Sequence, residues 1–305
     1  MSTSVSVTVP ATTANIGPGF DCLGAALTLY NHFRFTLLAQ PAGEVVIEVE
    51  GLEAERVVTD RSNLAYKAFA SYFHQRGLVV PAVAIAIDLA VPLARGLGSS
   101  STAIVGGLLG ANALCDAPLD QSALVEMAIA IEGHPDNVVP ALIGGCQLAA
   151  ANDDGSSTLC PIPWHQDVTP IVAIPDFELS TAEARRVLPD TYSRADAIFN
   201  TAHLGLLLRG LETGRGDWLR AAMGDRIHQP YRQTLIAGYE TVATAAIEAG
   251  AYGLVISGAG PTLLALAPAQ SAAQVCDAMA TAWQQTGQSV MAQVLALETQ
   301  GASVS

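Results

Sequence analysis

The sequence predicts an α+β fold in two domains, and three observations support this class. Half of the 305 residues are hydrophobic, which is enough to build one large or two medium-sized cores. Strand and helix patterns occur in both halves without the regular βα alternation of a Rossmann sheet. The composition becomes polar and then proline-rich over residues 151–167. We therefore predict an N-terminal domain over 1–163 and a C-terminal domain over 164–305.

The N-terminal half begins with patterns typical of strands and of one amphipathic helix. Apolar and alternating runs predict strands at 5–9, 44–50 and 82–88. The first of these strands is expected to end at Pro10. Apolar residues at helical spacing predict a helix over 62–77, which Ser62 or Asn63 caps and Gly77 ends.

Two more helices are predicted in this half. One starts near Ser99 and carries glycines at 106, 107 and 110. Each glycine costs about 1 kcal/mol relative to alanine in a helix interior, so close packing of this helix is the expected compensation. The other runs from Asp120 to about Ile131, and the glycine and proline that follow end it.

The C-terminal half predicts a second set of strands and helices. A strand at 170–175 precedes a helix that starts with a capping box, in which Ser180 and Glu183 have the required spacing. Helices follow to about residue 249. The remaining elements are a strand–turn–strand unit at 253–268, a helix near 270–285 and a strand near 289–297.

The charge balance argues against nucleic acids and membranes as partners. The formal net charge is -14, and an acidic chain repels nucleic acid and anionic membrane surfaces. Thirteen arginines and one lysine, Lys67, form no basic cluster. We interpret Lys67 as an exposed surface residue. No uncharged apolar run has the length of a membrane span.

The cysteines indicate a reducing compartment. There are five, at positions 22, 115, 146, 160 and 276, and none forms a C-x-x-C pair. An odd number without metal-ligand spacing is typical of buried free thiols rather than of disulfides or a zinc site. The first residues lack the order of charged and apolar residues in a secretory signal. We therefore expect a cytoplasmic protein.

The stretch VPLARGLGSSSTA, residues 91–103, predicts a phosphate site that contains no lysine. Gly96 and Gly98 allow positive φ and close approach of the backbone to a ligand. The helix that follows presents unpaired N–H groups and the positive end of its dipole. The hydroxyls of residues 99–101 can donate to phosphate or ligate Mg²⁺. The structural alternative is an ordinary glycine turn before a serine-capped helix.

The stretch IEGHPDNVVP, residues 131–140, concentrates polar side chains just past a helix end. Glu132 can hold Mg²⁺, and His134 or Asn137 can contact a hydroxyl-bearing substrate. The alternative is a polar turn in which Asp136 and Asn137 serve only as caps. A zinc site is not indicated, because no cysteine accompanies the histidine.

Two glycine-rich turns complete the set of candidate stretches. In TTANIGPGFDCLG, residues 12–24, Asn15 and Asp21 flank a Gly-Pro-Gly turn. In SGAGPT, residues 257–262, glycines and a proline lie between apolar strands. Each is either a plain turn or a backbone surface against a ligand.

Together and in this order, these motifs resemble the GHMP small-molecule kinases over nearly the whole chain. PLARGLGSSST resembles their phosphate loop and ISGAGPT their C-terminal glycine motif. Within the group, ATTANIGPGFDCLG, EGHPDNVVPALIGG, STAEARRVLP and DRIHQPYR resemble the homoserine kinases. The loop departs from the usual serine–serine–alanine, since residues 99–102 carry four hydroxyls. The resemblance implies a two-domain GHMP kinase fold, with an N-terminal domain like ribosomal protein S5 domain 2 and a ferredoxin-like C-terminal domain.

The resemblance also implies an activity and its cofactors. Homoserine kinases use ATP and Mg²⁺ to phosphorylate the side-chain hydroxyl of L-homoserine to O-phospho-L-homoserine, on the route to threonine. The implied ATP-binding residues are Pro92, Leu93, Ala94, Arg95, Gly96, Leu97, Gly98, Ser99, Ser100, Ser101, Thr102 and Asn63. The implied metal ligands are Ser100 and Glu132. The implied substrate-binding residues are Asn15, Asp21, His134, Asn137, Thr181, Arg185, Arg232 and Gly258.

The catalytic residues implied by the resemblance are Asn137, Glu132 and Ser100, without a dedicated base. Asn137 matches the position of an aspartate base in mevalonate kinase-like relatives, and an amide cannot accept the proton usefully. We predict that Asn137 orients the hydroxyl, with Asp136 as the fallback base. Other hypotheses stay open: a GHMP-type kinase with a mevalonate-, shikimate- or sugar-type substrate, a non-catalytic metabolite sensor of the same fold, or an α+β protein whose glycine turns are only structural. A homodimer also stays open.

Overall fold

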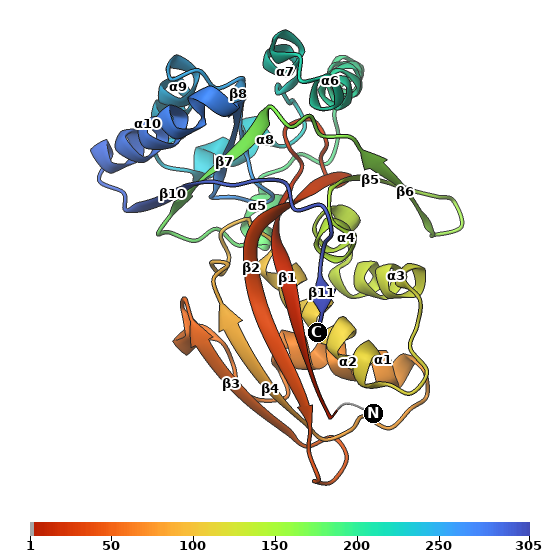
Figure 1. Cartoon of the computed structure of the whole chain (residues 1–305). Coiled ribbons are helices and arrows are strands. Elements are labelled where there is room, and N and C mark those ends of the chain that lie inside the picture. The colour runs from red at the N-terminus through yellow and green to blue at the C-terminus, as the bar shows by residue number, and fades with distance from the viewer. Residues whose placement is uncertain (1–2) are drawn as a thin grey trace.

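Two β-sheets form the frame of the chain, in a computed structural model that describes residues 3–305 (Figure 1). The larger sheet has the order β11-β1-β2-β4-β3, and β5 extends it by pairing with β2 and with β6. Its β3–β4 pair is parallel, whereas the other pairs are antiparallel. The strands of this sheet are β1 Ser4–Ala14, β2 Leu23–Leu37, β3 Val45–Gly51, β4 Val83–Leu89, β5 Cys146–Ala151, β6 Ser157–Ile162 and β11 Ser303–Val304.

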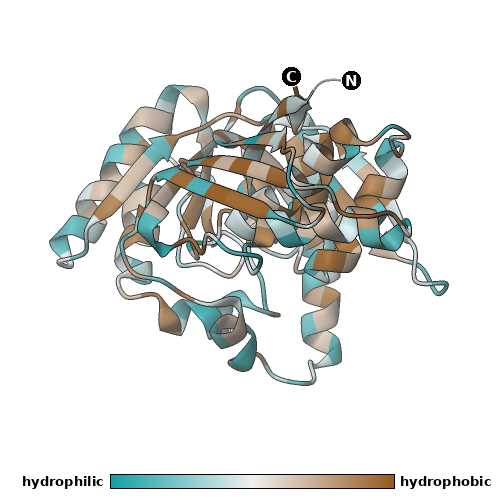
Figure 2. Cartoon of the chain, turned by 90° about the horizontal axis from the view of Figure 1, so that it is seen from below, coloured by the Kyte–Doolittle hydropathy of each residue, from teal (hydrophilic) through white to brown (hydrophobic). Residues whose placement is uncertain are grey.

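The smaller sheet is antiparallel throughout and has the order β10-β7-β9-β8. Its strands are β7 Val168–Pro175, β8 Gly253–Ile256, β9 Leu263–Pro268 and β10 Val290–Val294. One apolar cluster joins the two sheets, since Leu23 and Leu27 of β2 share it with Val172 and Leu264. The apolar residues drawn brown in Figure 2 accordingly concentrate in the strands, and the hydrophilic ones in the outer loops.

Helices cover the sheets and supply most of the remaining core. The helices α1 to α4 lie together on one face of the larger sheet (Figure 1). In the described part of the chain, none of the helices combines the length and the apolar composition that crossing a bilayer requires. The helices are α1 Leu64–Gln75, α2 Ser99–Leu114, α3 Gln121–Glu132, α4 Pro135–Ile143, α5 Thr181–Arg186, α6 Arg194–Thr213, α7 Gly216–Ala222, α8 Gln229–Arg232, α9 Tyr239–Glu248 and α10 Ala272–Gln285, with 3-10 turns η1 Ala54–Arg56, η2 Gln233–Leu235 and η3 Ala269–Ser271.

The packing of α2 confirms why its glycines are tolerated. A Cβ atom at Gly106 would lie 2.7 Å from the ring of Phe33, and one at Gly110 would lie 2.3 Å from the ring of Phe35. Both rings project from β2 and are buried. The helix therefore approaches the sheet closely enough to offset the low helix propensity of glycine.

Several sequence predictions of elements are corrected by the structure. The first strand does not end at Pro10 but continues to Ala14, because a register shift between Pro10 and Ala11 accommodates the missing N–H. The stretch after Gly133 is not a plain turn, since Pro135 begins the helix α4. The last predicted strand ends at residue 294 rather than near 297. The elements β2, β5, β6 and β11 were not predicted.

The prediction of buried thiols holds fully for one cysteine. All five cysteines are free, but Cys146 alone among them is buried, Cys22, Cys115 and Cys276 are partly buried, and Cys160 is exposed. Cys160 lies on β6, which among the described residues pairs only with β5.

The C-terminal strap, residues 295–305, returns from the smaller sheet to the larger one. Glu298 N donates to Ala26 O, and Gly145 N donates to Glu298 O. β11 then pairs with β1 (Figure 1). The predicted domain boundary at 163/164 falls between β6 and β7. The strap crosses this division, since it follows the smaller sheet in sequence but pairs with the larger one. The boundary therefore stays a prediction.

Candidate active site

One cavity of about 340 Å³ lies where the phosphate loop meets both sheets. Segments from six separate parts of the sequence converge on it. We call it the candidate cavity, and its lining residues are Asn15, Asp21, Ala94, Arg95, Gly96, Gly98, Ser99, Ser100, Glu132, His134, Asp136, Asn137, Leu179, Ser180, Thr181, Arg185, Arg232, Gly258, Ala259 and Gly260. The cavity therefore contains every predicted substrate-binding residue and both predicted metal ligands.

The phosphate loop is held open by two left-handed glycines. Gly96 has φ 80°, and Gly98, the N-cap of α2, has φ 68°. A Cβ at Gly96 would lie 2.3 Å from Ser257 O, and one at Gly98 would lie 2.0 Å from Thr12 Oγ1. Both glycines are therefore required by contacts within the protein, in addition to any approach of a ligand. Ser99 and Ser100 line the cavity at the start of α2, where helix N–H groups lack intrahelical partners.

Not all predicted ATP-binding side chains face the candidate cavity. Pro92, Leu93, Leu97, Ser101 and Thr102 do not line it. Thr102 instead donates to Ser99 O and accepts from Asn31 Nδ2, which ties the loop to β2. Asn31 was not predicted, because a single asparagine within a strand carries no local signal.

Asn63 also lies away from the candidate cavity, and its side chain is used locally. Its Oδ1 accepts from Ala65 N and Tyr66 N to cap α1, and its Nδ2 donates to Val58 O. The prediction that Asn63 caps this helix is confirmed, whereas its contact with adenine stays a prediction. Lys67 is exposed, which confirms the interpretation of this lysine as a surface residue.

A carboxylate and two hydroxyls meet between α2 and α3. Glu132 Oε1 accepts from Ser100 Oγ at 2.9 Å and from Ser101 Oγ at 3.2 Å. The described residues contain no group of three or more His, Cys, Asp or Glu side chains that could hold a metal ion. An oxygen-only set with one carboxylate nevertheless fits Mg²⁺, which commonly completes its shell with water and substrate phosphates.

A hydrogen-bonded chain fixes Asn137 at the start of α4. Thr12 Oγ1 donates to Asn137 Oδ1 at 2.8 Å, and Asn137 Nδ2 donates to Asp136 Oδ1 at 3.3 Å. Asp136 is buried, and its Oδ1 also lies 2.7 Å from His134 Nδ1. This hydrogen bond raises the pKa of His134, although burial opposes it. Thr12 was missed from the sequence, because its partner lies 125 positions away.

Opposite this chain, two predicted substrate-binding groups pair with each other. Arg185 Nη1 donates to Asp21 Oδ2 and Arg185 Nη2 to Asp21 Oδ1, both at 2.9 Å. The pair links α5 to the loop after β1. Asp21 has φ 56°, and its N–H donates to Asn15 Oδ1. The site thus presents a paired carboxylate and guanidinium, which complement an amine and a carboxylate.

Arg232 lies behind this pair and is buried. Its Nε donates to Ala184 O at 3.1 Å, and its Nη1 donates to Gly258 O at 3.0 Å. Burial lowers the pKa of Arg232 from its ordinary value, and nearby carboxylates oppose the shift. Gly258 O also accepts from Asn15 Nδ2, so the glycine turn after β8 organises both polar side chains.

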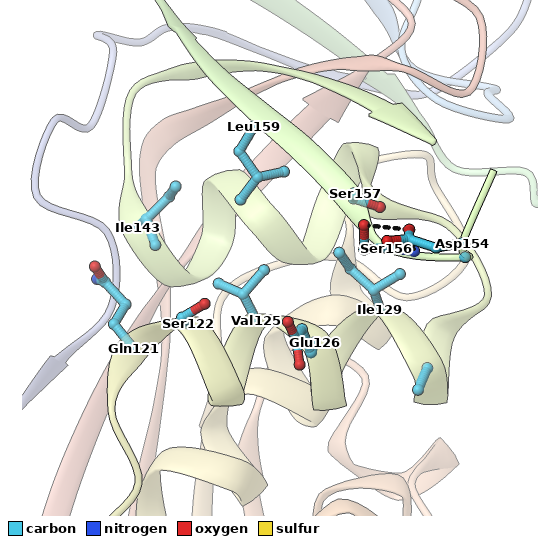
Figure 3. Close-up of a pocket in the computed structure, with 12 residues that line it drawn as sticks. Gln121, Ser122, Val125, Glu126, Ile129, Ile143, Asp154, Ser156, Ser157 and Leu159 are labelled. Carbon is cyan, nitrogen blue, oxygen red and sulfur yellow. Dashed lines mark hydrogen bonds between the residues drawn. The ribbon is translucent and has the colours of Figure 1, made fainter. Parts of the chain in front are cut away.

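A larger cavity, of about 620 Å³, lies between α3 and the β5–β6 hairpin. Figure 3 shows Val125 and Ile129 on α3 facing Leu159 of the hairpin. We call it the α3–hairpin cavity. None of the predicted site residues lines it.

Comparisons with known proteins show the family to which the chain belongs. The family model described as "GHMP kinases N terminal domain" matches residues 63–145, and "GHMP kinases C terminal" matches residues 207–285. A homoserine kinase from Trichormus variabilis is 63% identical over 300 residues, which cover 98% of each chain. The chain belongs to the homoserine kinase family of GHMP kinases. A homoserine kinase from Crocosphaera subtropica is 58% identical over 304 residues, which are 100% of this chain and 98% of the relative.

Solved structures place the same fold in other GHMP kinases. The crystal structure of a homoserine kinase from Cytophaga hutchinsonii aligns with a TM-score of 0.91 at 29% identity, covering 100% of this chain and 98% of that one. A mevalonate kinase from L. major aligns with a TM-score of 0.74 at 14% identity over 96% of both chains, which shows the fold alone. The predicted fold class, an α+β two-domain GHMP kinase fold, is confirmed.

Proposed function

We propose that this chain transfers the γ-phosphoryl group of ATP to the side-chain hydroxyl of L-homoserine, giving O-phospho-L-homoserine for threonine biosynthesis. The observation that supports this substrate most directly is the Asp21–Arg185 pair in the same cavity as the phosphate loop. A zwitterion with a short hydroxylated side chain matches that pairing. Five free cysteines fit the predicted cytoplasmic location.

The phosphate end of the site binds the donor. Backbone N–H groups of the loop and the start of α2 hold the β- and γ-phosphates, without a lysine. Glu132 and Ser100 would hold Mg²⁺, and Ser101 lies within reach of the same carboxylate oxygen. When bound, Mg²⁺ neutralises charge on the phosphate oxygens.

The acceptor end binds the zwitterion by replacing the ion pair between Asp21 and Arg185 with two ion pairs to the substrate. The substrate amine takes the place of Arg185 beside Asp21, and the substrate carboxylate takes the place of Asp21 beside Arg185. Charge-assisted pairs are thus retained when the substrate enters, so neither charge is left unpaired. Arg232 and Thr181 add donors to the carboxylate, and Asn15 shapes the turn beneath the amine.

Asn137 orients the reacting hydroxyl without removing its proton. Phosphoryl transfer through a loose transition state depends mainly on positioning and charge stabilisation, so a strong base is not required. Thr12 fixes the Asn137 amide, and Asp136 is already engaged by His134 and Asn137.

An ATP-consumption assay with L-homoserine, L-serine, L-threonine, mevalonate and shikimate side by side tests the substrate. We expect the highest kcat/KM with L-homoserine. Preference for any other alcohol would overturn the substrate assignment, and nucleotide binding without turnover would favour the sensor hypothesis.

The zwitterion pocket is tested by Arg185→Met against Arg186→Met. Hydrogen bonds to charged groups contribute about 1.5–3 kcal/mol, so Arg185→Met should lower kcat/KM for homoserine by about 10- to 100-fold. Arg186 is exposed on the same helix and does not line the cavity, so its variant should match the wild type. Equal losses in both variants would contradict the proposed pocket.

A further inference from the structure

Arg95 lines the candidate cavity, and its guanidinium contacts the backbone of another segment, residues 175–176. Only 7% of this side chain is exposed. Its guanidinium makes four hydrogen bonds within the protein: Nε donates to Pro175 O (3.0 Å), Nη1 to Leu93 O (2.8 Å), and Nη2 to Asp176 O (2.7 Å) and Glu53 Oε1 (3.2 Å). Nη1 also forms an ion pair with Glu178 Oε1 at 3.1 Å. A guanidinium carries five N–H donors, so four of them are engaged by protein groups. Contacts within the protein therefore dominate the surroundings of this guanidinium.

Two acidic and two basic side chains form a closed ring of alternating charge at this point. Arg95 contacts Glu53 and Glu178, and Arg56 contacts the same two carboxylates. We call these four residues the charge ring. Glu53 also accepts from Leu93 N at 2.9 Å, so its carboxylate holds the backbone of the phosphate loop as well.

The charge ring joins three parts of the chain that are distant in sequence. Glu53 and Arg56 lie at η1, after β3 of the larger sheet. Glu178 lies between β7 and α5, directly before three residues that line the candidate cavity, 179–181. Leu179 N also lies 3.4 Å from Ala94 O. Arg95 therefore connects the loop that binds ATP to the segment that carries the acceptor-binding helix.

We propose that Arg95 is a positioning residue, which sets the phosphate loop against α5 so that the donor phosphate and the acceptor hydroxyl meet at the reactive distance. This inference rests on the proposed function. It follows from the partners of Arg95, three of which lie at positions 175–178, in the segment that leads from β7 to α5. Small misplacements of reacting groups reduce rates strongly even when binding is retained.

The effect of Arg95 is measured by separating kcat from KM. Arg95→Met should lower kcat by about 100-fold, because a misplacement of about 1 Å has that scale, while KM for ATP changes less than five-fold. Arg95→Lys, which keeps the charge but supplies fewer donors in a different geometry, should fall between Arg95→Met and the wild type. A rise in KM for ATP at unchanged kcat would overturn the proposal, because it would indicate direct phosphate binding.

Glu178→Gln provides a second variant that is expected to fold. Its side chain is 40% exposed, so the substitution leaves no buried charge unpaired. We expect kcat to fall about two- to five-fold, the size of an exposed ion pair's contribution. Since the loss passes through Arg95, Glu178→Gln should add nothing in the Arg95→Met background. Additive losses, or an unchanged kcat in a folded Glu178→Gln enzyme, would overturn the proposal.

Asp217→Asn is the matched control. Asp217 forms an ion pair of similar exposure with Arg215 on α7, away from the cavity. This variant should keep the wild-type kcat, and thermal unfolding should show that all variants compared are folded. If the wild type prefers another alcohol, the substrate assignment fails, and the same kcat ratios measured with that alcohol still decide the role of Arg95.

Discussion

Helix α3 lines two cavities of opposite character. Its last residue, Glu132, faces the candidate cavity of about 340 Å³, whereas Val125, Glu126 and Ile129 face the α3–hairpin cavity of about 620 Å³. The smaller cavity gathers charged and polar groups from distant segments of both sheets. The larger one has an apolar interior supplied by α3, the end of α4 and one hairpin. Convergent charges, rather than volume, favour the smaller cavity as the candidate active site.

The largest expected effect is on kcat, and it separates two glutamates of α3 that line different cavities. Glu132→Gln should lower kcat by about 1,000-fold, or about 4 kcal/mol, because it removes the carboxylate that accepts from Ser100 and Ser101. It should also raise the Mg²⁺ concentration needed for half-maximal rate. Steady-state assays over a Mg²⁺ titration measure both.

Glu126→Gln is the control for that substitution. Glu126 is exposed and lines the α3–hairpin cavity, so its neutral variant should retain wild-type activity. A comparable loss in both variants would show that the two cavities are not functionally distinct.

A smaller loss is expected at Asn137. Asn137→Ala should reduce kcat by one to two decades, at about 1.4 kcal/mol per decade, because orientation of the hydroxyl is lost while ATP binding is kept. Thr12→Val, which removes only the hydrogen bond to Asn137, should lower kcat less. If Asn137→Ala abolished turnover as completely as Glu132→Gln, the absence of a base would be wrong.

The α3–hairpin cavity should respond in stability rather than in rate. Val125 is buried, so Val125→Ala should lower the free energy of unfolding by about 1–2 kcal/mol. Activity per folded molecule should stay within two-fold of the wild type. Denaturant unfolding measures the loss of stability, and a rate assay on the same preparation measures the activity. A ten-fold loss of rate would instead connect this cavity to catalysis.

Local signals in the sequence predicted the helix starts well. Asn63, Asp120 and Ser180 each accept hydrogen bonds from backbone N–H groups at the start of a helix. These contacts span two or three residues, so the sequence contains both partners. The glycines of α2 were likewise predicted to mark close packing.

Such local signals could not predict hydrogen bonds between residues that are far apart in the sequence. Thr12, Asn31 and Glu53 hold the site in place, but their partners lie far along the chain. The direction of the Arg95 side chain is set by residues 175–178, so the motif alone suggested a phosphate contact. β2 was missed although it spans 15 residues, because both of its faces are largely buried toward its start and it lacks simple alternation.

The C-terminal strap has a consequence for how the chain is made. Because β11 pairs with β1, the outer edge of the first strand is covered by residues 303–304, which follow all the other strands in sequence. The larger sheet is thus completed only after every strand of the smaller sheet has been synthesised.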